Sequence, residues 1–164
     1  MVQVSVLGIA LDAAGQHIVL LKPQEEPTGA GRVLPVWIGA QEATSILIAV
    51  EGQHAPRPLS HDLITTLFGT VGAKVERVEV TRLEEGTFFA EMTLTTPTGL
   101  QVLDARPSDA VALAVRADAP IFVADAVLDE AGIPAEMADL RDDEEKLDEF
   151  KEFLEDVDPE DFQG

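Results

Sequence analysis

The sequence lacks cysteine and tyrosine entirely and contains a single tryptophan. Without cysteine, neither a disulfide framework nor a thiolate-ligated metal site can form. Without tyrosine, no phenol is available for catalysis. The apolar start of the chain lacks the basic region of a signal peptide, and Gly8 and Asp12 interrupt it well short of a membrane span. We therefore expect a cytoplasmic protein without membrane association.

Basic residues are also scarce, with 11 Lys and Arg against 31 Asp and Glu, for a net charge of −20. From Glu136 to the end there are 14 acids and 3 bases, a charge of −11. The preceding 17 acids and 8 bases leave −9. A field of this sign repels phosphate backbones, so it disfavours passive nucleic-acid binding. Chemistry on nucleic acid remains possible where divalent cations bridge carboxylates to phosphates.

The pattern of apolar residues predicts an α+β fold at the size of one ordinary domain. Short apolar or alternating runs between turn residues predict strands at Val2–Leu11, Ile18–Leu21, Val33–Ile38, Val75–Leu83, Thr87–Thr95, Leu100–Asp104 and Ile121–Val123. Helical spacing predicts helices at Gln41–Glu51, Ser60–Val71, Asp109–Arg116 and Asp125–Ala131. This order favours a mixed, mainly antiparallel sheet with helices packed on it.

We divide the chain into a domain over residues 1–132 and a tail over residues 133–164. An expected linker, Gly132–Asp139, leads from the domain into the tail. The tail continues as an acidic C-terminal amphipathic helix with leucines seven residues apart. Its acids form a solubilising surface or compete with nucleic acid for the arginines, and its apolar seam docks on the body or on another subunit. That seam, together with an exposed strand edge, predicts a homo-oligomer.

Two Arg-Pro segments, Pro56–Asp62 and Asp104–Asp109, carry the most unusual polar chemistry of the sequence. In each, an Arg precedes Pro and is thereby biased toward extended backbone. A Ser follows at an expected helix N-cap, and an Asp lies in the first turn, where it complements the positive helix end. Good helix capping alone accounts for the serines and aspartates.

Capping does not account for the arginines or for His61. If the two helix starts converge, they form a pocket in which backbone N–H groups favour an anion. Carboxylates there can hold Mg²⁺ or Mn²⁺, and the arginines and serines can bind phosphate. The expected metal ligands are Asp62, Asp109, Asp104 and Glu42. The expected phosphate-binding residues are Arg57, Arg106, Ser60 and Ser108, with His61, Asp62, Asp109 and both arginines as the catalytic set.

Each of these residues also has a purely structural interpretation. A lone histidine is more often structural than catalytic, and its neighbour Asp62 points elsewhere because adjacent helical residues do not face one another. Glu42 is an ordinary acid of a first helical turn. Trp37 is interpreted as a core or interface residue.

Five segments in order resemble the bifunctional nuclease family: Leu34–Gly39 with Glu42-Ala43, Pro56–Leu63, Glu85–Ala90, Ala105–Ala110 and Pro120–Val123. The end of the chain, Glu149–Phe162, looks like the tail of actinobacterial members. The resemblance implies an α+β nuclease domain that acts on both DNA and RNA with a divalent metal. The matching motif positions are Glu42, Arg57, His61, Asp62, Arg106, Ser108 and Asp109. Two departures are Ser60 in place of Thr and Phe89 in place of Tyr.

The leading hypothesis is thus a metal-assisted nuclease with little sequence preference, in which His61 or a metal-bound water supplies the base. The alternative is a non-catalytic module that binds an anion or small molecule, or regulates through an interaction, using the same Arg-Pro helix starts. The negative charge of the body supports this alternative.

Overall fold

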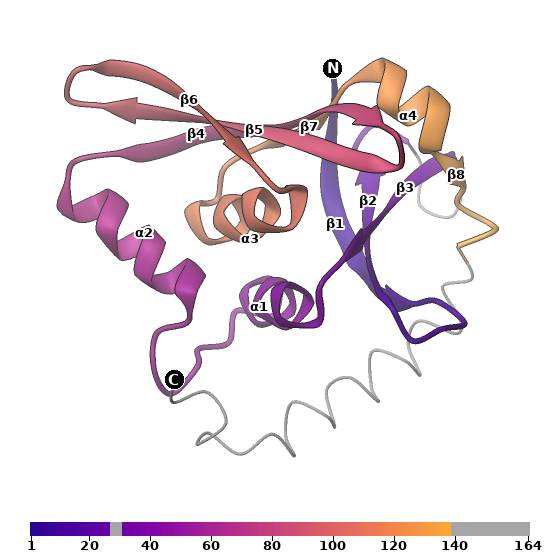
Figure 1. The fold of residues 1–164 in the computed structure, drawn as a ribbon, viewed down its shortest axis with the longest axis horizontal. Coiled ribbons are helices and arrows are strands. Elements are labelled where there is room, and N and C mark those ends of the chain that lie inside the picture. Colours follow the sequence, from indigo (N-terminus) through magenta and orange to yellow (C-terminus); the bar gives the residue numbers. More distant parts are fainter. Residues whose placement is uncertain (27–30, 139–164) are drawn as a thin grey trace.

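The computed structural model describes residues 1–26 and 31–138, which fold into an eight-stranded sheet with helices packed on it (Figure 1). The strands are β1 (Val2–Leu11), β2 (His17–Pro23), β3 (Arg32–Ile38), β4 (Lys74–Glu84), β5 (Thr87–Thr96), β6 (Gly99–Ala105), β7 (Ile121–Val123) and β8 (Ile133–Pro134). The helices are α1 (Ala40–Val50), α2 (Ser60–Thr70), α3 (Pro107–Ala117) and α4 (Asp125–Ala131). The expected α+β class is confirmed, and the expected C-terminal helix lies outside the described residues.

The sheet consists of two antiparallel units joined by a very short strand. Its order is β6-β5-β4-β7-β1-β2-β3-β8, so β1–β3 and β4–β6 are separate meanders. Strand β7 pairs antiparallel with β1 and parallel with β4. In Figure 1, β1–β3 run steeply down the page while β4–β6 run across it, which reflects strong sheet twist. The mainly antiparallel sheet predicted from the sequence is confirmed.

Alternation along the strands divides the apolar residues between two clusters. Val19 and Leu21 of β2 are buried in the main core, whereas Ile18 and Leu20 belong to a second cluster, because successive strand residues face opposite sides. Ala135 and Ala138 complete the second cluster. The start of the expected linker is therefore packed on the sheet, since β8 pairs with β3 and holds these residues there. The division at residue 132 stays a prediction.

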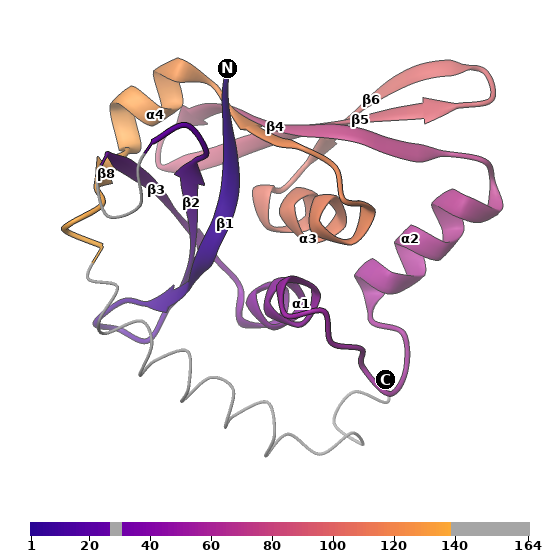
Figure 2. The same cartoon turned by 180° about the vertical axis from the view of Figure 1, so that it is seen from behind.

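Helices α1 and α3 lie side by side on one side of the sheet, as Figures 1 and 2 both show. Small side chains allow the two helices to pack closely together. Helix α3 buries Ala110, Ala112 and Ala114. Among the helices described, none is long and apolar enough to cross a membrane.

Helix α2 forms where its apolar periodicity predicts, but its apolar face is only partly covered. Ile64 and Phe68 pack against the main core, whereas Leu63, Leu67 and Val71 are exposed. All five belong to the apolar pattern that predicts this helix. Three of them are nevertheless exposed because α2 packs against α3 along one side only, at the end of the helical layer.

The β1–β2 turn fixes the position of the only tryptophan. Gly15 has a φ of 77°, a conformation that favours glycine, and the Oδ1 atom of Asp12 accepts the N–H groups of Ala14 and Gln16 at 2.9 and 2.8 Å. The Oδ2 atom of Asp12 accepts the Nε1–H of Trp37 at 3.1 Å. Trp37 is 52% exposed, so of its two expected places the core was wrong, and the interface stays a prediction.

Candidate active site

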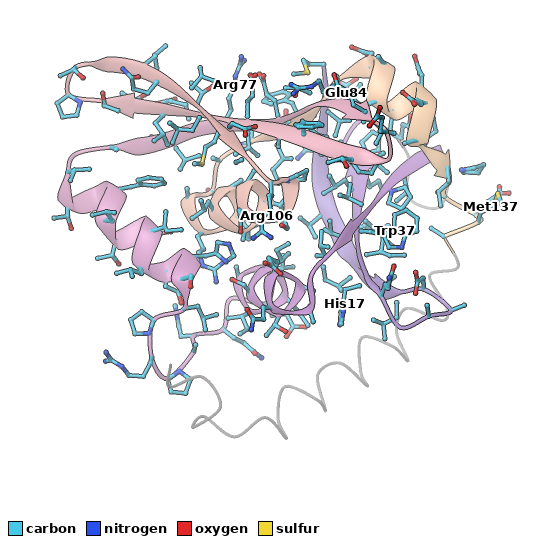
Figure 3. All side chains as sticks on the ribbon, viewed as in Figure 1. His17, Trp37, Arg77, Glu84, Arg106 and Met137 are labelled. Atoms are coloured by element: carbon cyan, nitrogen blue, oxygen red, sulfur yellow. The ribbon has the colours of Figure 1, made fainter. Side chains whose placement is uncertain are left out.

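The first turns of α1, α2 and α3 meet around Arg106, which is the N-cap residue of α3. The Nε of Arg106 donates to Asp109 Oδ2 at 2.8 Å, and Nη2 donates to Glu42 Oε1 at 2.9 Å. Arg106 is nevertheless largely exposed, and within residues 1–26 and 31–138 its other N–H groups have no partner and can bind solvent or a ligand. Figure 3 shows Arg106 between α3 and α1. The two carboxylates thus fix a guanidinium at the surface.

His61, the second residue of α2, links this surface to the interior. Its Nε2 lies 2.8 Å from Asp109 Oδ1, and its Nδ1 lies 2.6 Å from Ser45 Oγ. Burial raises the pKa of Asp109, but hydrogen bonds and charges from Arg106 and His61 outweigh it and hold that pKa below its ordinary value. The ionised carboxylate only accepts, so we assign the proton to Nε2 and let Nδ1 accept the Ser45 hydroxyl.

Arg116, near the end of α3, extends this set of contacts beyond Ser45. Its side chain is 8% exposed, and Nη2 donates to Ser45 Oγ at 2.9 Å. Its Nε donates to Asp62 Oδ1 at 2.8 Å, and Nη1 donates to the Ala112 carbonyl at 3.0 Å. Burial raises the pKa of Asp62, but the Arg116 and Leu59 hydrogen bonds outweigh it and lower that pKa overall.

These contacts form one chain of six side chains, which we call the helix-start network. In order they are Arg116, Ser45, His61, Asp109, Arg106 and Glu42. The network spans α1, α2 and α3. The convergence of two helix starts, an assumption at the level of sequence, is present in the structure and includes a third helix.

Neither serine of the Arg-Pro segments caps its helix. The N-cap residues are Leu59 and Arg106, without a capping side-chain hydrogen bond, so the expectation for Ser60 and Ser108 was wrong. In α2 the Oδ2 atom of Asp62 accepts the Leu59 N–H at 2.9 Å instead. In α3 the proline at the first helical position carries no N–H and so needs no partner there.

A cavity of about 700 Å³ opens beside Arg106. Its wall is formed by β3, by the β1–β2 and β4–β5 turns, and by the starts of α1 and α3. Trp37, Phe88, His17 and Ser108 line it together with Arg106. Burial lowers the pKa of His17, which is therefore neutral at pH 7. Among the described residues of the wall, Arg106 is the only side chain with a permanent charge.

The structure brings together only part of the predicted site. Glu42, His61, Asp62, Arg106 and Asp109 belong to the helix-start network or contact it. Ser108 is buried and lines the cavity beside Arg106. The other three expected residues, Arg57, Ser60 and Asp104, are exposed, and among the described residues none has a hydrogen bond or ion pair to the network. Asp104 lies on β6, on the edge strand of the sheet.

Sequence reasoning missed Ser45, Arg116 and His17. Ser45 sits within the apolar pattern of α1, and Arg116 matches an ordinary base in a last helical turn. His17 is at the start of β2, where nothing in its neighbourhood marks it. The turn Asp12–Gly15 is the one local signal, because β2 begins with His17 just after it, and β2 pairs with β3, which carries Trp37.

Ser45, His61 and Asp109 have the composition of a nucleophilic triad, but the arrangement does not suit one. Ser45 is 4% exposed, its oxygen already accepts from Arg116, and it does not line the cavity. A nucleophile must reach its substrate. Ser45 and His61 instead fix the orientation of Asp109, and Asp109 fixes that of Arg106.

The expected metal ligands do not fit a divalent cation as they are arranged. Asp62 uses one carboxylate oxygen for Arg116 and the other for a backbone N–H, while Asp109 uses its two for His61 and Arg106. Glu42 is bound to Arg106. Among the described residues, no three His, Asp or Glu side chains are close enough to hold a metal ion. At Asp62 and Asp109 a cation would have to compete with an arginine for the carboxylate.

Comparison with known families covers all of the helix-start network and most of the cavity wall, with Gln16 and His17 outside the matched residues. The sequence profile of the bifunctional nuclease domain matches residues 19–136. The chain belongs to the bifunctional nuclease domain family. The family resemblance carried by the five sequence segments is therefore confirmed, and the helix-start network and the cavity both draw on the matched residues.

The relatives of this bifunctional nuclease domain fall into two groups. A Mycobacterium tuberculosis protein described as uncharacterized is 40% identical over 99% of this chain and 98% of its own length. Bifunctional nuclease 2 of Oryza sativa subsp. japonica is 27% identical over 77% of this chain and 40% of its own length. Bifunctional nuclease 2 of Arabidopsis thaliana is 28% identical over 67% of this chain and 33% of its own length. The chain thus spans less than half of these plant relatives.

Proposed function

We propose that the chain is a nuclease that hydrolyses phosphodiester bonds in both DNA and RNA with little sequence preference. The observation that carries this is Arg106, a guanidinium held by two carboxylates yet exposed at the edge of a 700 Å³ cavity. A fixed guanidinium with free N–H groups suits a phosphate and the charge that develops on it in the transition state. Family membership and the names of the plant relatives support the reaction class.

Within this proposal, Arg106 binds the scissile phosphate and His17 accepts the proton of the attacking water. His17 lines the same cavity and is neutral at pH 7, as a general base must be. Asp109 remains ionised and, with His61 behind it, keeps Arg106 aligned. The expected base was His61 or a metal-bound water, but the burial of His61 and its absence from the described cavity wall favour a positioning role for it.

The test compares highly purified wild type with Arg106→Ala on single-stranded DNA and RNA. We expect Arg106→Ala to lower kcat/KM by about a hundredfold or more, as for loss of one transition-state contact. Arg77→Ala is the matched control, because Arg77 is a half-exposed, ion-paired arginine on β4, far from Arg106 in Figure 3. Equal cleavage by all three proteins would identify a contaminating nuclease and refute the proposal.

Assistance by Mg²⁺ or Mn²⁺ is a separate proposal that rests on the family resemblance alone. Because the carboxylates are bound to arginines in this arrangement, we derive no step through a metal. Cleavage is measured after chelation and after each cation is added back. Full activity of the chelated wild type, lost in Arg106→Ala, would reject metal assistance while keeping the nuclease.

A non-catalytic anion-binding or regulatory module is the second candidate. The observation in its favour is that Asp62 and Asp109 are both engaged by arginines and so are unavailable for chemistry. The discriminating measurement is the thermal stability of the protein with nucleotides and simple anions, with and without metal. Stabilisation that Arg106→Ala abolishes, without any hydrolysis, would favour this module.

We also infer that the chain forms a homo-oligomer through α2 and β6. The residues that support this are exposed and apolar: Leu63, Leu67, Val71, Leu100 and Val102. Strand β6 ends the sheet order, and a free strand edge can pair with its own copy. Light scattering should show the protomer mass for Leu67→Glu and a multiple of it for wild type. A monomeric wild type would refute the inference.

A further inference from the structure

The cavity beside Arg106 has an aromatic wall that phosphate binding does not use. Trp37 reaches it from β3 and Phe88 from β5. Trp37 is exposed, yet its ring is held by the 3.1 Å hydrogen bond from Nε1 to Asp12. An exposed indole in a fixed orientation loses little freedom when a flat ring stacks on it. The wall is therefore prepared for a planar ligand.

The cavity also differs from the rest of the molecule in charge. The chain carries −20 overall, but no Asp or Glu lines the cavity among the described residues. Arg106 supplies a positive charge at one side, and the remaining wall is apolar or neutral. A volume of about 700 Å³ lies within the roughly 300–1,000 Å³ typical of ligand pockets. A ligand with a flat ring and one anionic group matches this distribution.

Three of the sequence segments that resemble the nuclease family contribute side chains to the wall of this cavity. They are Leu34–Gly39, Glu85–Ala90 and Ala105–Ala110, which contribute Trp37, Phe88 and Arg106 respectively. The aromatic residues of the first two have no part in the helix-start network. Their common position explains why two aromatic segments accompany an arginine segment in one domain.

We propose that this cavity is a nucleobase subsite: one unpaired base stacks on Trp37, Phe88 contacts it from the wall, and the adjoining phosphate lies at Arg106. The proposal rests on the proposed nuclease function and names its substrate as a strand with accessible bases. Stacking accepts any base, because every base has a π-face, and so it agrees with action on both DNA and RNA.

The test separates base from phosphate by using two probes. One is a short thymidine single strand with phosphorothioate linkages, which slow cleavage, and the other is an abasic strand with the same number of phosphates. Trp37→Ala should weaken binding of the thymidine strand about fivefold or more, the low end for loss of one stacked base. It should change binding of the abasic strand less than twofold. Arg106→Ala should weaken both.

Phe89→Ala is the matched control for Phe88→Ala. Phe89 is the next residue on β5 and stacks with Arg82 instead, 4.0 Å from guanidinium carbon to ring centroid. Phe88→Ala should discriminate between the two strands as Trp37→Ala does, and Phe89→Ala should not. Circular dichroism confirms that each variant is folded. Equal weakening of both strands, or of neither, by Trp37→Ala would overturn the proposal.

Two further readouts use the unmodified protein. Trp37 is the only tryptophan and there is no tyrosine, so intrinsic fluorescence reports this one position. The thymidine strand should quench it, and the abasic strand should not; quenching by neither strand overturns the proposal. Cleavage of a thymidine strand with normal phosphodiester linkages distinguishes a failure of the subsite proposal from a failure of the nuclease proposal. Cleavage that Trp37→Ala leaves unchanged rejects the subsite alone, and base-dependent binding without any cleavage rejects the nuclease alone.

Discussion

Replacing Asp62 by Asn removes the charge that balances Arg116, one of the most buried cations of the described structure. The Arg116 side chain is 8% exposed, and that of Asp62 is 37% exposed. Loss of a charge-assisted hydrogen bond costs about 1.5–3 kcal/mol, and breaking a fully buried ion pair costs about 3–5 kcal/mol. Since solvent reaches Asp62, the lower range applies. Asparagine keeps an oxygen that can accept the Leu59 N–H, so loss of the helix cap adds little to the destabilisation. We expect about 2 kcal/mol of destabilisation.

The measurement is urea or thermal unfolding followed by circular dichroism at neutral pH. For a chain of this size, about 2 kcal/mol corresponds to a fall in Tm of roughly 4–8 °C. Glu84→Gln is the control, because its ion pair with Arg82 is exposed on both sides and is worth about 0–1 kcal/mol. If Asp62→Asn and Glu84→Gln destabilise equally, the burial of Arg116 has no energetic consequence and the reasoning fails.

Three further predictions concern the cavity and the helix-start network. Because the folded-state pKa of Asp109 lies below its ordinary value of 3.8, the stability it contributes is present above that pH and falls on further acidification. Asp109→Asn should flatten this loss of stability in thermal unfolding measured between about pH 5 and about pH 2; an equal pH dependence of Tm in the variant and the wild type contradicts it. His17→Gln should lower kcat by about a hundredfold and remove an acid limb of the rate profile lying below pH 6.5, whereas His54→Gln, at an exposed loop position, should change neither. Glu42→Gln should tighten binding of the abasic strand roughly two- to fivefold, because Arg106 loses a competing charge, and weaker binding would show that Glu42 instead holds Arg106 in place.

The fold was predictable because its elements have strong local signals. Alternating Phe88, Ala90, Met92 and Leu94 gave β5, and the periodicity of α2 gave a helix at the right place. The face that α2 buries was not predictable, since that depends on how much of the helix α3 covers. Strand β8 escaped prediction because two residues carry no periodicity.

The candidate site was predictable only at residues that are unusual for their local sequence. Arg106 and His61 stand out because helix starts do not need them. Ser45 does not stand out, since a serine inside a helix needs no explanation, and only the packing of α1 against α3 brings it to Arg116. Arg57 has the same sequence signal as Arg106, but it lies in an exposed loop. Local sequence thus identifies unusual residues without showing which of them meet.

Strand β7 has a consequence for how the protein is made. Its three residues, Ile121–Val123, are the only sheet link between β1 and β4 in the part of the chain that the structure describes. Each meander can form from local contacts, but their union waits for a segment more than 115 residues after the start of β1. Such distant pairing slows folding. During synthesis the ribosome must therefore release Ile121–Val123 before the sheet can close, and until then both meanders expose an edge to any chaperone or neighbouring nascent chain.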